Sequence, residues 1–489
     1  MLVDALLDAN RRSPRTLAVS DGATSLNYKQ LTRLAMILRD VVVENTQRKH
    51  VGLMLPATAV FPAALFGTWW CEKVAVPLNF LLHGDELARI VEDADIDLIL
   101  TIRPFAELSQ KLPARTVFLE DLPIKRRMLT GVLRRPARAP DVDPDDTAVI
   151  LFTSGTSAKP KGVMLTYRNL HSNCVDTIES LRLLSHHSFL NVLPPFHVFG
   201  LTANTLVPVF LRTSVHAIPR FDPLSVVRTV ERERIAIMMA VPSMYAAILR
   251  TKSSNPDAFR SIYLAIAGGE PLPDSVRDGF AERFGIPLRQ GYGLTETSPI
   301  VAVSSVDASR EGTVGRPINN VSVRIVDAEG RDLSVGDEGE ILVSGPGVMK
   351  GYYQQPQATA EVIDAKGWLH TGDVGRIDDD GFLAITGRAK EMLIIGGENV
   401  FPREIEVVLE AHEHVLQAAV IGIADPLRGE APVAFVIPNK GAELTGAELR
   451  IFARKSLPSF KTPKRIEIRD DLPTGPTGKI VKRKLRELL

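Results

Sequence analysis

The sequence predicts an α/β protein in which a large N-terminal domain precedes a small α+β domain. Its 489 residues are enough for roughly three compact units of ordinary domain size. Up to about Leu151, strand-like apolar runs such as Val51–Leu55 alternate with helical stretches such as Tyr28–Val42, which is the pattern of α/β units around a parallel sheet. From Gly312 to Gly387, short alternating strands between glycine turns predict a β-rich subdomain.

Roughly the last hundred residues have the pattern of a separate α+β domain. Pro402 stands where a helix would begin, and Thr445 with Glu448 forms a capping-box pair for a second helix. The apolar runs at 418–423 and 433–437 predict strands. The first helix would turn one apolar face inward, formed by Ile405, Val408 and Leu409.

The composition is that of a soluble globular protein. Hydrophobic residues make up 45% of the chain and charged residues 24%, which excludes disordered and fibrous classes. Lys+Arg and Asp+Glu are each 58, so no net charge attracts the chain to nucleic acid, and any anion site must be local. Cys71 and Cys174 form no C-x-x-C pair, which argues against a disulfide framework and favours a reducing, cytoplasmic location. Met1–Asp8 is interrupted by acids, unlike a secretory signal.

Two uncharged runs, residues 51–71 and 190–211, are long enough to cross a bilayer. Prolines break both, so we expect buried strand–turn–helix units and no transmembrane span. A basic cluster before the acidic stretch 141–146 predicts a solvated connector between subdomains, with a peripheral membrane contact as the alternative. The cluster consists of Lys125, Arg126, Arg127, Arg134, Arg135 and Arg138.

The stretch from Leu151 to Val163 is a candidate polyphosphate site. An apolar strand leads into a loop that is rich in hydroxyl groups, glycines and lysines, and the helix after it would be capped by Thr166. A polar surface turn is the alternative for such a loop, and the spacing excludes a Walker loop. The candidate phosphate ligands are Thr153, Ser154, Gly155, Thr156, Ser157, Lys159 and Lys161, with Gly162 allowing close approach.

A second candidate site lies between Arg289 and Ser298. There an aromatic ring, a hydroxyl and a carboxylate follow one another within one turn, as Tyr292, Thr295 and Glu296. Such a set can supply a face for a base, a phosphate donor and a Mg²⁺ ligand. The Gly-Tyr-Gly here lacks the third glycine of a dinucleotide fingerprint.

Three further residues admit both a structural and a functional interpretation. His197 lies in an apolar run, where a lone histidine is usually a core or turn residue. Asp373 follows a Thr-Gly turn and could be an Asx-turn residue, but a carboxylate can also accept two ribose hydroxyls. Lys479 sits in a glycine-rich turn before a basic tail, in which Lys482, Arg483, Lys484 and Arg486 are expected to be solvated charges.

Together these motifs resemble, in the same order, those of the adenylate-forming acyl-CoA synthetases. The resemblance covers essentially the whole chain. Two departures are visible: Ala158 stands where the family usually has glycine, and Thr474 with Gly475 replaces a basic residue and a threonine.

The resemblance implies a role for each motif. It divides the chain into a large AMP-binding domain at 1–389 and a mobile small domain at 390–489, with the hinge at Lys390. Glu296 would bind Mg²⁺, His197 would border the acyl pocket, and Thr295 would contact the α-phosphate. Lys479 would neutralise the carboxylate and the α-phosphate. The nucleoside would contact Gly268, Gly269, Glu270, Tyr292, Asp373 and Arg388.

The implied reaction has two steps. A carboxylic acid attacks the α-phosphate of ATP to give an acyl-adenylate and pyrophosphate, and the thiol of coenzyme A then displaces AMP. An amino acid is a poor candidate, because His197 stands where amino-acid-activating relatives tend to have aspartate. A fatty or aryl acid is favoured by apolar residues near the motifs, namely Phe196, Phe199, Val241, Ala265, Ala267 and Ile300.

Two alternatives remain at this stage. An acyl-AMP ligase would load an acyl carrier protein instead of coenzyme A, although such enzymes usually carry an insertion that is not evident here. A non-catalytic nucleotide sensor could share the fold. Glu296, Asp373 and Lys479 argue against the sensor because they are the groups that the reaction needs.

Overall fold

The computed structural model describes residues 1–124, 127, 136–153, 160–251, 255–395, 398–426, 428–474 and 480–489. Most of the candidate phosphate loop, Ser154 to Lys159, lies outside the described residues, as does Lys479. The same holds for Lys125, Arg126, Arg134 and Arg135 of the basic cluster. Arg127, from that cluster, pairs with Glu44 at 3.3 Å.

Within the described residues, the largest sheet has nine strands in the order β15-β14-β13-β12-β11-β9-β10-β1-β2. The strands from β13 to β1 in this order are parallel to their neighbours, and β2, β14 and β15 run antiparallel at the two edges. The bounds are β1 Leu17–Ser20, β2 Ser25–Asn27, β9 Phe189–Asn191, β10 Val215–Ala217, β11 Ile237–Ala240, β12 Leu264–Gly268, β13 Leu288–Gly293, β14 Ile300–Val303 and β15 Arg316–Pro317.

A second sheet contains seven described strands in the order β18-β8-β7-β4-β3-β5-β6. Its strands from β7 to β6 are parallel, as the sequence predicts for this region. The first two strands of the chain, β1 and β2, do not join this sheet and belong to the nine-stranded one. The bounds are β3 His50–Met54, β4 Val74–Pro77, β5 Leu98–Thr101, β6 Arg115–Phe118, β7 Thr147–Thr153, β8 Lys161–Thr166 and β18 Gly351–Tyr352.

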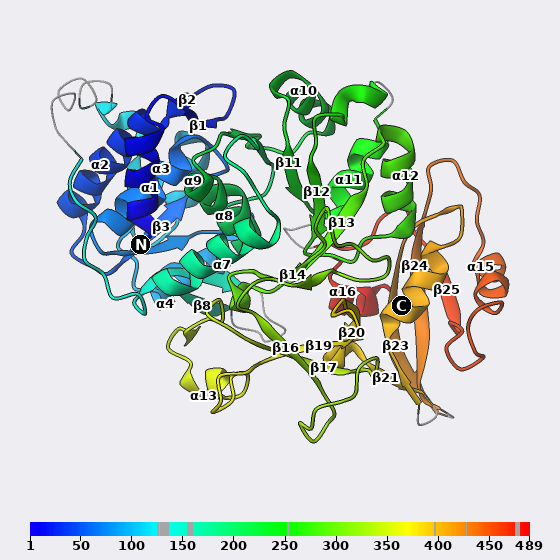
Figure 1. Ribbon diagram of the computed structural model, residues 1–489. Coiled ribbons are helices and arrows are strands. Elements are labelled where there is room, and N and C mark those ends of the chain that lie inside the picture. Colours follow the sequence, from blue (N-terminus) through cyan, green and yellow to red (C-terminus); the bar gives the residue numbers. More distant parts are fainter. Residues whose placement is uncertain are drawn as a thin grey trace.

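Helices pack between these two sheets and on their outer faces (Figure 1). The buried helix α3 is apolar on all sides, which explains the first uncharged run as core. No helix of the described residues is long and apolar enough to cross a membrane. The inner helices are α1 Leu2–Arg12, α2 Tyr28–Asn45, α3 Val60–Trp70, α7 Tyr167–Ser180, α8 Val198–Leu201 and α9 Val207–Leu211; the outer ones include α4 Gly84–Asp93, α5 Ala106–Ser109, α10 Pro223–Glu233, α11 Pro242–Leu249 and α12 Asp274–Phe284.

The predicted β-rich subdomain is an antiparallel sheet in the order β16-β17-β19-β20. Its core side chains include Ile325, Ile341 and Leu383. The strands are β16 Ser322–Val326, β17 Gly339–Ser344, β19 Leu369–Ile377 and β20 Leu383–Arg388, and the short helix α13 spans Pro356–Ala360.

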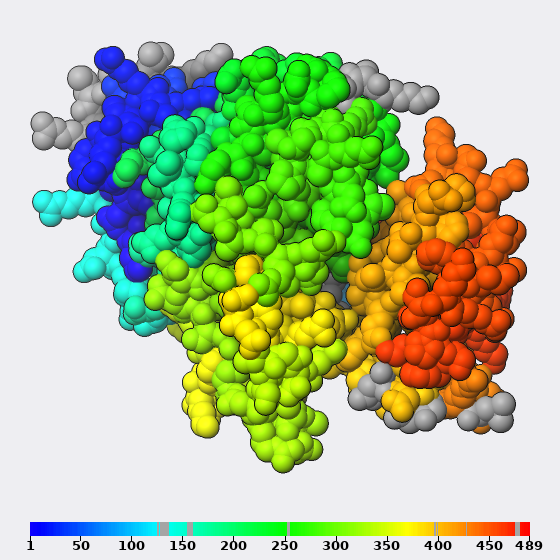
Figure 2. Space-filling view, turned by 45° about the vertical axis from the view of Figure 1, so that its right-hand side comes forward, coloured from blue at the N-terminus to red at the C-terminus, as the bar shows by residue number. Residues whose placement is uncertain are grey.

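The C-terminal part has its own sheet and two small cores. In Figure 2 it lies, orange to red, against the green and yellow parts of the chain. Pro402 begins α14 and Thr445 caps α15 through Glu448, so both predicted helix starts are confirmed. The predicted α/β chain with a small α+β C-terminal domain is therefore confirmed. The elements are β21 Leu393–Ile395, β22 Glu398–Val400, α14 Pro402–Glu410, β23 Val415–Asp425, β24 Gly429–Pro438, α15 Gly446–Ala453, β25 Arg465–Ile468 and α16 Lys482–Leu485.

Candidate active site

A buried carboxylate joins β13 to the antiparallel sheet. The phenol of Tyr292 donates a hydrogen bond to Oδ2 of Asp373 over 2.7 Å. Arg388 Nε lies 2.8 Å from Oδ1 of the same carboxylate. Asp373 and Arg388 face each other across β19 and β20, and the Asp373 side chain is only 4% exposed. Donors from β13 and β20 therefore meet at one acceptor group on β19.

The surroundings fix the protonation of the two donors. Burial raises the pKa of Tyr292 well above its usual value, and the neighbouring Asp373 raises this pKa further. The charge of Asp373 likewise raises the pKa of the Arg388 guanidinium. Tyr292 therefore keeps its proton at neutral pH and acts as a hydroxyl donor.

A second carboxylate, Glu296, lies on the short 3-10 helix η6 (Thr295–Thr297) that follows β13. Its Oε1 accepts a hydrogen bond from the hydroxyl of Tyr352 over 2.8 Å. Lys161 Nζ lies 4.4 Å from the centre of the Tyr352 ring. Burial and the charge of Glu296 raise the pKa of Tyr352, so its hydroxyl keeps its proton and orients the carboxylate.

The sequence analysis did not identify Tyr352. It lies on β18, a strand of two residues, which carries no periodic signal. Its role depends on the pairing of β18 with β8, where Tyr352 faces Val163. This pairing brings Tyr352 beside Lys161 and Glu296.

The turn that contains Thr295 and Glu296 is hydrogen-bonded to α7. The buried amide of Asn173 donates to the carbonyl oxygens of Thr297 and Ile300 over 3.2 and 2.9 Å. The backbone N–H of Met349 donates to the carbonyl oxygen of Glu296 over 2.8 Å. Glu296 is therefore presented by a rigid backbone, which favours a ligand role over a mobile surface charge.

The hairpin β7–β8 supplies the described ends of the phosphate loop. Thr153 and Lys161 are directly paired across it. A Cβ on Gly162 would come within 3.0 Å of the Ile150 side chain, so this position suits glycine. The predicted cap of the following helix is confirmed, since Thr166 accepts a hydrogen bond from Asn169 N. The base of the loop thus lies beside the Glu296 turn.

The other predicted contacts lie at the ends of β12 and at α8. Gly268 faces Gly291 across β12 and β13, and a Cβ on Gly268 would lie 3.2 Å from the Phe199 ring. Gly269 has φ +83°, a conformation that glycine adopts readily, and Glu270 follows it. His197 is the N-cap of α8, which also carries Phe199. The structure therefore brings the histidine segment to the same strand ends as the Tyr292 segment.

The predicted apolar residues do not share one surface. Phe196 is buried and meets Phe80 edge to face at 4.9 Å. Ala265 and Ala267 instead pack into the core behind β12, with Tyr245 and Phe280. Successive side chains of a strand point to opposite faces, so these alanines point away from the face on which Gly268 meets Phe199.

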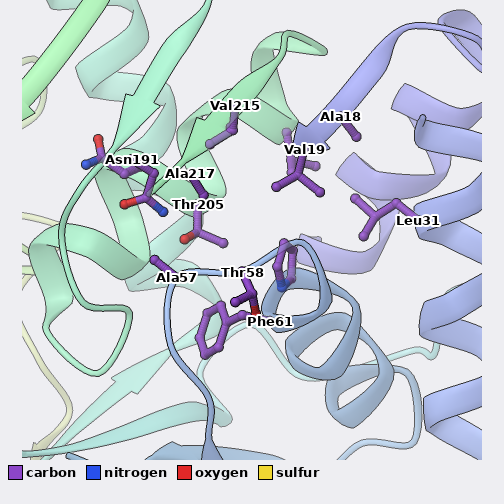
Figure 3. Close-up of a pocket in the computed structure, with 13 residues that line it drawn as sticks. Ala18, Val19, Leu31, Ala57, Thr58, Phe61, Asn191, Thr205, Val215 and Ala217 are labelled. Atoms are coloured by element: carbon purple, nitrogen blue, oxygen red, sulfur yellow. The ribbon is translucent and has the colours of Figure 1, made fainter. Parts of the chain in front are cut away.

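A separate cavity of about 20 Å³ lies between the two large sheets, at the π-helical segment η4 (Thr202–Leu206). Figure 3 shows Asn191, Thr205, Thr58 and Phe61 around it. The volume is sufficient for roughly one water molecule, and none of the predicted site residues lines it. This cavity therefore lies apart from the residues predicted to contact the acid.

The donor set around Glu296 is compatible with magnesium. The described residues contain no group of three or more His, Cys, Asp or Glu side chains that could enclose a metal ion. Mg²⁺ does not need one, because it is usually bound by one or two carboxylates together with substrate phosphates. Glu296, oriented by Tyr352 and close to Lys161, meets that requirement.

The profile of the AMP-binding enzymes matches residues 6–353, and the profile of their C-terminal domain matches residues 404–479. The chain belongs to the AMP-binding enzyme family. It is 36% identical to a feruloyl-CoA synthase of Amycolatopsis over 97% of this chain and 96% of that protein. It is 33% identical to a long-chain-fatty-acid–CoA ligase of Yersinia pestis over 90% of this chain and 85% of that protein.

Among solved structures, ATP-bound MatB from Rhodopseudomonas palustris superposes with a TM-score of 0.91 at 29% identity, over 100% of this chain and 99% of the other. For apo MatB at the same identity and coverage the TM-score is 0.81. The predicted activity, an AMP-forming ligase that joins a carboxylic acid to coenzyme A with ATP and Mg²⁺, is confirmed for this AMP-binding enzyme.

Tyr352→Phe tests the contact with Glu296. We expect it to lower pyrophosphate release by about tenfold and to raise the Mg²⁺ concentration needed for half-maximal rate, because a hydrogen bond to a charged group contributes about 1.5–3 kcal/mol. The matched control is Tyr353→Phe, whose hydroxyl contacts only the exposed Gln354 among the described residues. Equal Mg²⁺ dependence in the two variants would contradict the orienting role.

Proposed function

We propose that the residues identified above carry out both half-reactions of this AMP-binding enzyme. The proposal is supported by two candidate ligand-binding contacts on the turn from Tyr292 to Glu296. Tyr292 with Asp373 stands at the start of the turn and Glu296 with Tyr352 at its end. One nucleotide placed along the turn would have its ribose at the first contact and its phosphates at the second.

The nucleoside would be held at Asp373. A carboxylate has about four acceptor positions, so the bonds from Tyr292 and Arg388 leave room for the two ribose hydroxyls. The Tyr292 ring offers a face for adenine. The backbone from Gly268 to Glu270, at the end of the neighbouring strand, would contact the other side of the base.

The phosphates would be held by the loop from Thr153 to Lys161, by Thr295, and by Glu296 through Mg²⁺. The metal supplies positive charge against the phosphate oxygens when it is bound. Lys161 adds an ammonium group from β8. In this proposal His197 borders the acyl group, and Lys479 contacts both the carboxylate and the α-phosphate. Two anions can then approach each other because positive charge surrounds them.

The two half-reactions would use two orientations of the domains 1–389 and 390–489. Lys390 lies exposed in the 3-10 turn η7 (Ala389–Glu391), directly after β20. The higher TM-score with ATP-bound than with apo MatB supports the assignment of the present arrangement to the ATP-binding orientation. Rotation about Lys390 would withdraw Lys479 and admit the thiol of coenzyme A.

Lys390→Pro tests the hinge. Proline fixes φ near −65°, which is close to the φ of a 3-10 turn, so the arrangement observed is retained while other backbone rotations are hindered. We expect pyrophosphate release to continue and thioester formation to fall by at least about tenfold. The measurement is single-turnover product analysis, with Lys390→Ala as the control, because it removes the same side chain without restricting φ. Unchanged thioester yield would reject a hinge at Lys390.

The acid would carry an apolar aryl or alkyl group. The ring of Phe199 beside Gly268 and the buried ring of Phe196 support this substrate class. The feruloyl-CoA synthase and the long-chain-fatty-acid ligase among the relatives support the aryl and the alkyl form, respectively. We also propose a cytoplasmic location, which is supported by two free cysteines, one of them fully buried.

The deciding experiment measures pyrophosphate release across hydroxycinnamic, benzoic and fatty acids of increasing length, with and without coenzyme A. We expect release with one of these classes and thioester only when coenzyme A is present. Release followed by transfer to an acyl carrier protein and not to coenzyme A would replace the proposed acceptor. No release with any acid, together with tight ATP binding, would favour a nucleotide sensor.

A further inference from the structure

Lys482 occupies an unexpected position in the small domain. The sequence predicts a solvated charge, and this prediction is wrong. Its ammonium group lies 2.6 Å from Glu391 Oε2 and 2.8 Å from Glu406 Oε1, and its side chain is only 25% exposed. Burial lowers the pKa of Lys482, but the two carboxylates outweigh burial and raise it overall, so the ammonium stays charged.

The three partners come from three different segments. Glu391 ends η7, directly after Lys390; Glu406 is buried on α14; and Lys482 begins α16, directly after the segment that contains Lys479. Glu406 Oε1 also accepts the backbone N–H of Val420 over 3.0 Å, which fixes the carboxylate to β23. The ammonium therefore connects the residue after the hinge to the core of the small domain.

The charge of Glu406 is compensated jointly by Lys482 and Arg403. Arg403 lies one turn earlier on α14, 3.7 Å from Glu406 and 2.9 Å from Glu410. This single guanidinium lies between two buried carboxylates, so it does not compensate Glu406 alone, and Lys482 supplies the second positive charge. Unlike Arg403, Lys482 also connects α14 to the segment after the hinge and to the segment that follows Lys479. In the proposed reaction these two segments move together.

On the other side of the hinge, Arg388 belongs to the large domain. It is the strand partner of Asp373 and forms the ion pair with that carboxylate. Between Arg388, held by the large domain, and Glu391, held by Lys482, only Ala389 and Lys390 remain. Both are exposed, so the backbone rotation can be confined to these two residues.

The base of the Lys479 loop is also fixed to the small domain. Thr474 and Ile480 form an antiparallel bridge, and Val481 N donates to Pro473 O over 2.8 Å. Leu485, on the same short helix as Lys482, is fully buried against the sheet. The residues on both sides of 475–479 are therefore fixed to the small domain, and Lys482 links them to the segment after the hinge.

We infer that Lys482 is a positioning residue: by bridging Glu391 and Glu406 it makes the residue after the hinge and the base of the Lys479 loop one rigid body. Backbone rotation at Ala389 and Lys390 then moves Lys479 into or out of the active site, because the segment after the hinge and the base of the Lys479 loop move together. This inference rests on the proposed role of Lys479 and extends it to a residue that does not touch the substrate.

Lys482→Met removes the ammonium and keeps the apolar stem. We expect adenylation to slow by about tenfold, since small misplacements of a catalytic group cost one to two orders of magnitude. Conversion of a preformed acyl-adenylate to thioester should change by less than about threefold, because that step does not use Lys479. Lys482→Arg should recover most of the rate. The control is Lys484→Met, an exposed neighbour on the same helix, which should match the unmodified enzyme.

A double-mutant cycle separates positioning from general destabilisation. If Lys482 acts through Glu391, Glu391→Gln should slow adenylation to a similar extent, and the double variant should be no slower than either single variant. Additive losses, or equal loss of both half-reactions in Lys482→Met, would overturn the inference.

Amide hydrogen exchange gives a readout that is independent of catalysis. In Lys482→Met we expect the peptides around Glu391 and around residues 480–485 to exchange faster together, while those of α15 are unchanged. Faster exchange in only one of the two segments would refute the coupling. Because this comparison needs no substrate, it decides the inference even if the acid panel fails and the proposed function is rejected.

Discussion

Lys479→Ala is expected to abolish most acyl-adenylate formation while leaving thioester formation from a preformed adenylate nearly intact. In the first half-reaction a carboxylate must approach an α-phosphate, and the Lys479 ammonium would compensate both charges in the transition state. Removing one such contact typically costs about 3–4 kcal/mol, or about 10²–10³ in rate. In the second half-reaction, as proposed, the small domain would have rotated and the ammonium would no longer be at the reacting atoms.

The two steps can be measured separately. Pyrophosphate release reports the first, and conversion of synthetic acyl-adenylate in the presence of coenzyme A reports the second. Lys484→Ala is the matched control, because it removes the same charge from the exposed face of α16 and should leave both rates unchanged. Equal loss of both half-reactions in Lys479→Ala would reject the assignment of Lys479 to adenylation.

Local signals in the sequence predicted local structure well. Thr166, Pro402 and Thr445 each begin a helix as expected, because capping depends on side chains within the same turn. The strand predicted at Val51–Leu55, which is β3 in the structure, is recognisable from a continuous apolar run before a proline. These features require no knowledge of distant parts of the chain.

Sheet membership could not be predicted in the same way. Val19 of β1 pairs with Val215 of β10, far along the chain, and β18 adds two residues from the β-rich region to the second sheet. Both pairings satisfy the backbone groups of neighbouring strands, and nothing in the local sequence specifies the partner. The assignment of each strand to one of the two large sheets therefore depends on tertiary contacts.

The same distinction applies to the site. Tyr292, Glu296, Asp373 and Arg388 are predicted from motifs. The structure joins Tyr292 and Arg388 to Asp373, whereas Glu296 lies further along the same turn in contact with Tyr352. The motifs could not identify Tyr352, which orients Glu296 only after β18 has joined β8.

Charge in the small domain shows why exposure is hard to predict from composition. Ile405 and Leu409 of α14 face the core of the small domain as expected, but Glu406 is buried beside them. Its acceptor oxygen meets the Val420 N–H and the Lys482 ammonium, contacts that depend on β23 and α16. The basic tail, whose sequence predicts only solvated charges, therefore contains one lysine, Lys482, that pairs with the buried Glu406.

Asp373→Asn is expected to weaken the apparent affinity for ATP by about 10–100-fold, with a smaller effect on the maximal rate. The amide keeps the shape of the carboxylate but removes the charge that accepts from Tyr292 and, in the proposal, from the ribose. A hydrogen bond to a charged group contributes about 1.5–3 kcal/mol, which corresponds to that range. The KM for ATP in pyrophosphate release, at saturating acid, measures the effect.

The control must separate nucleotide binding from stability. Arg388 is 59% exposed, so water can replace part of its lost ion pair, and we expect only a small change in the melting temperature of Asp373→Asn. Asp380→Asn removes an exposed carboxylate that pairs with Arg310 in the turn between β19 and β20, and it should leave the KM for ATP unchanged. An unchanged KM in Asp373→Asn would show that the ribose is held elsewhere, and a large fall in melting temperature without a change in KM would make Asp373 a residue of the fold alone.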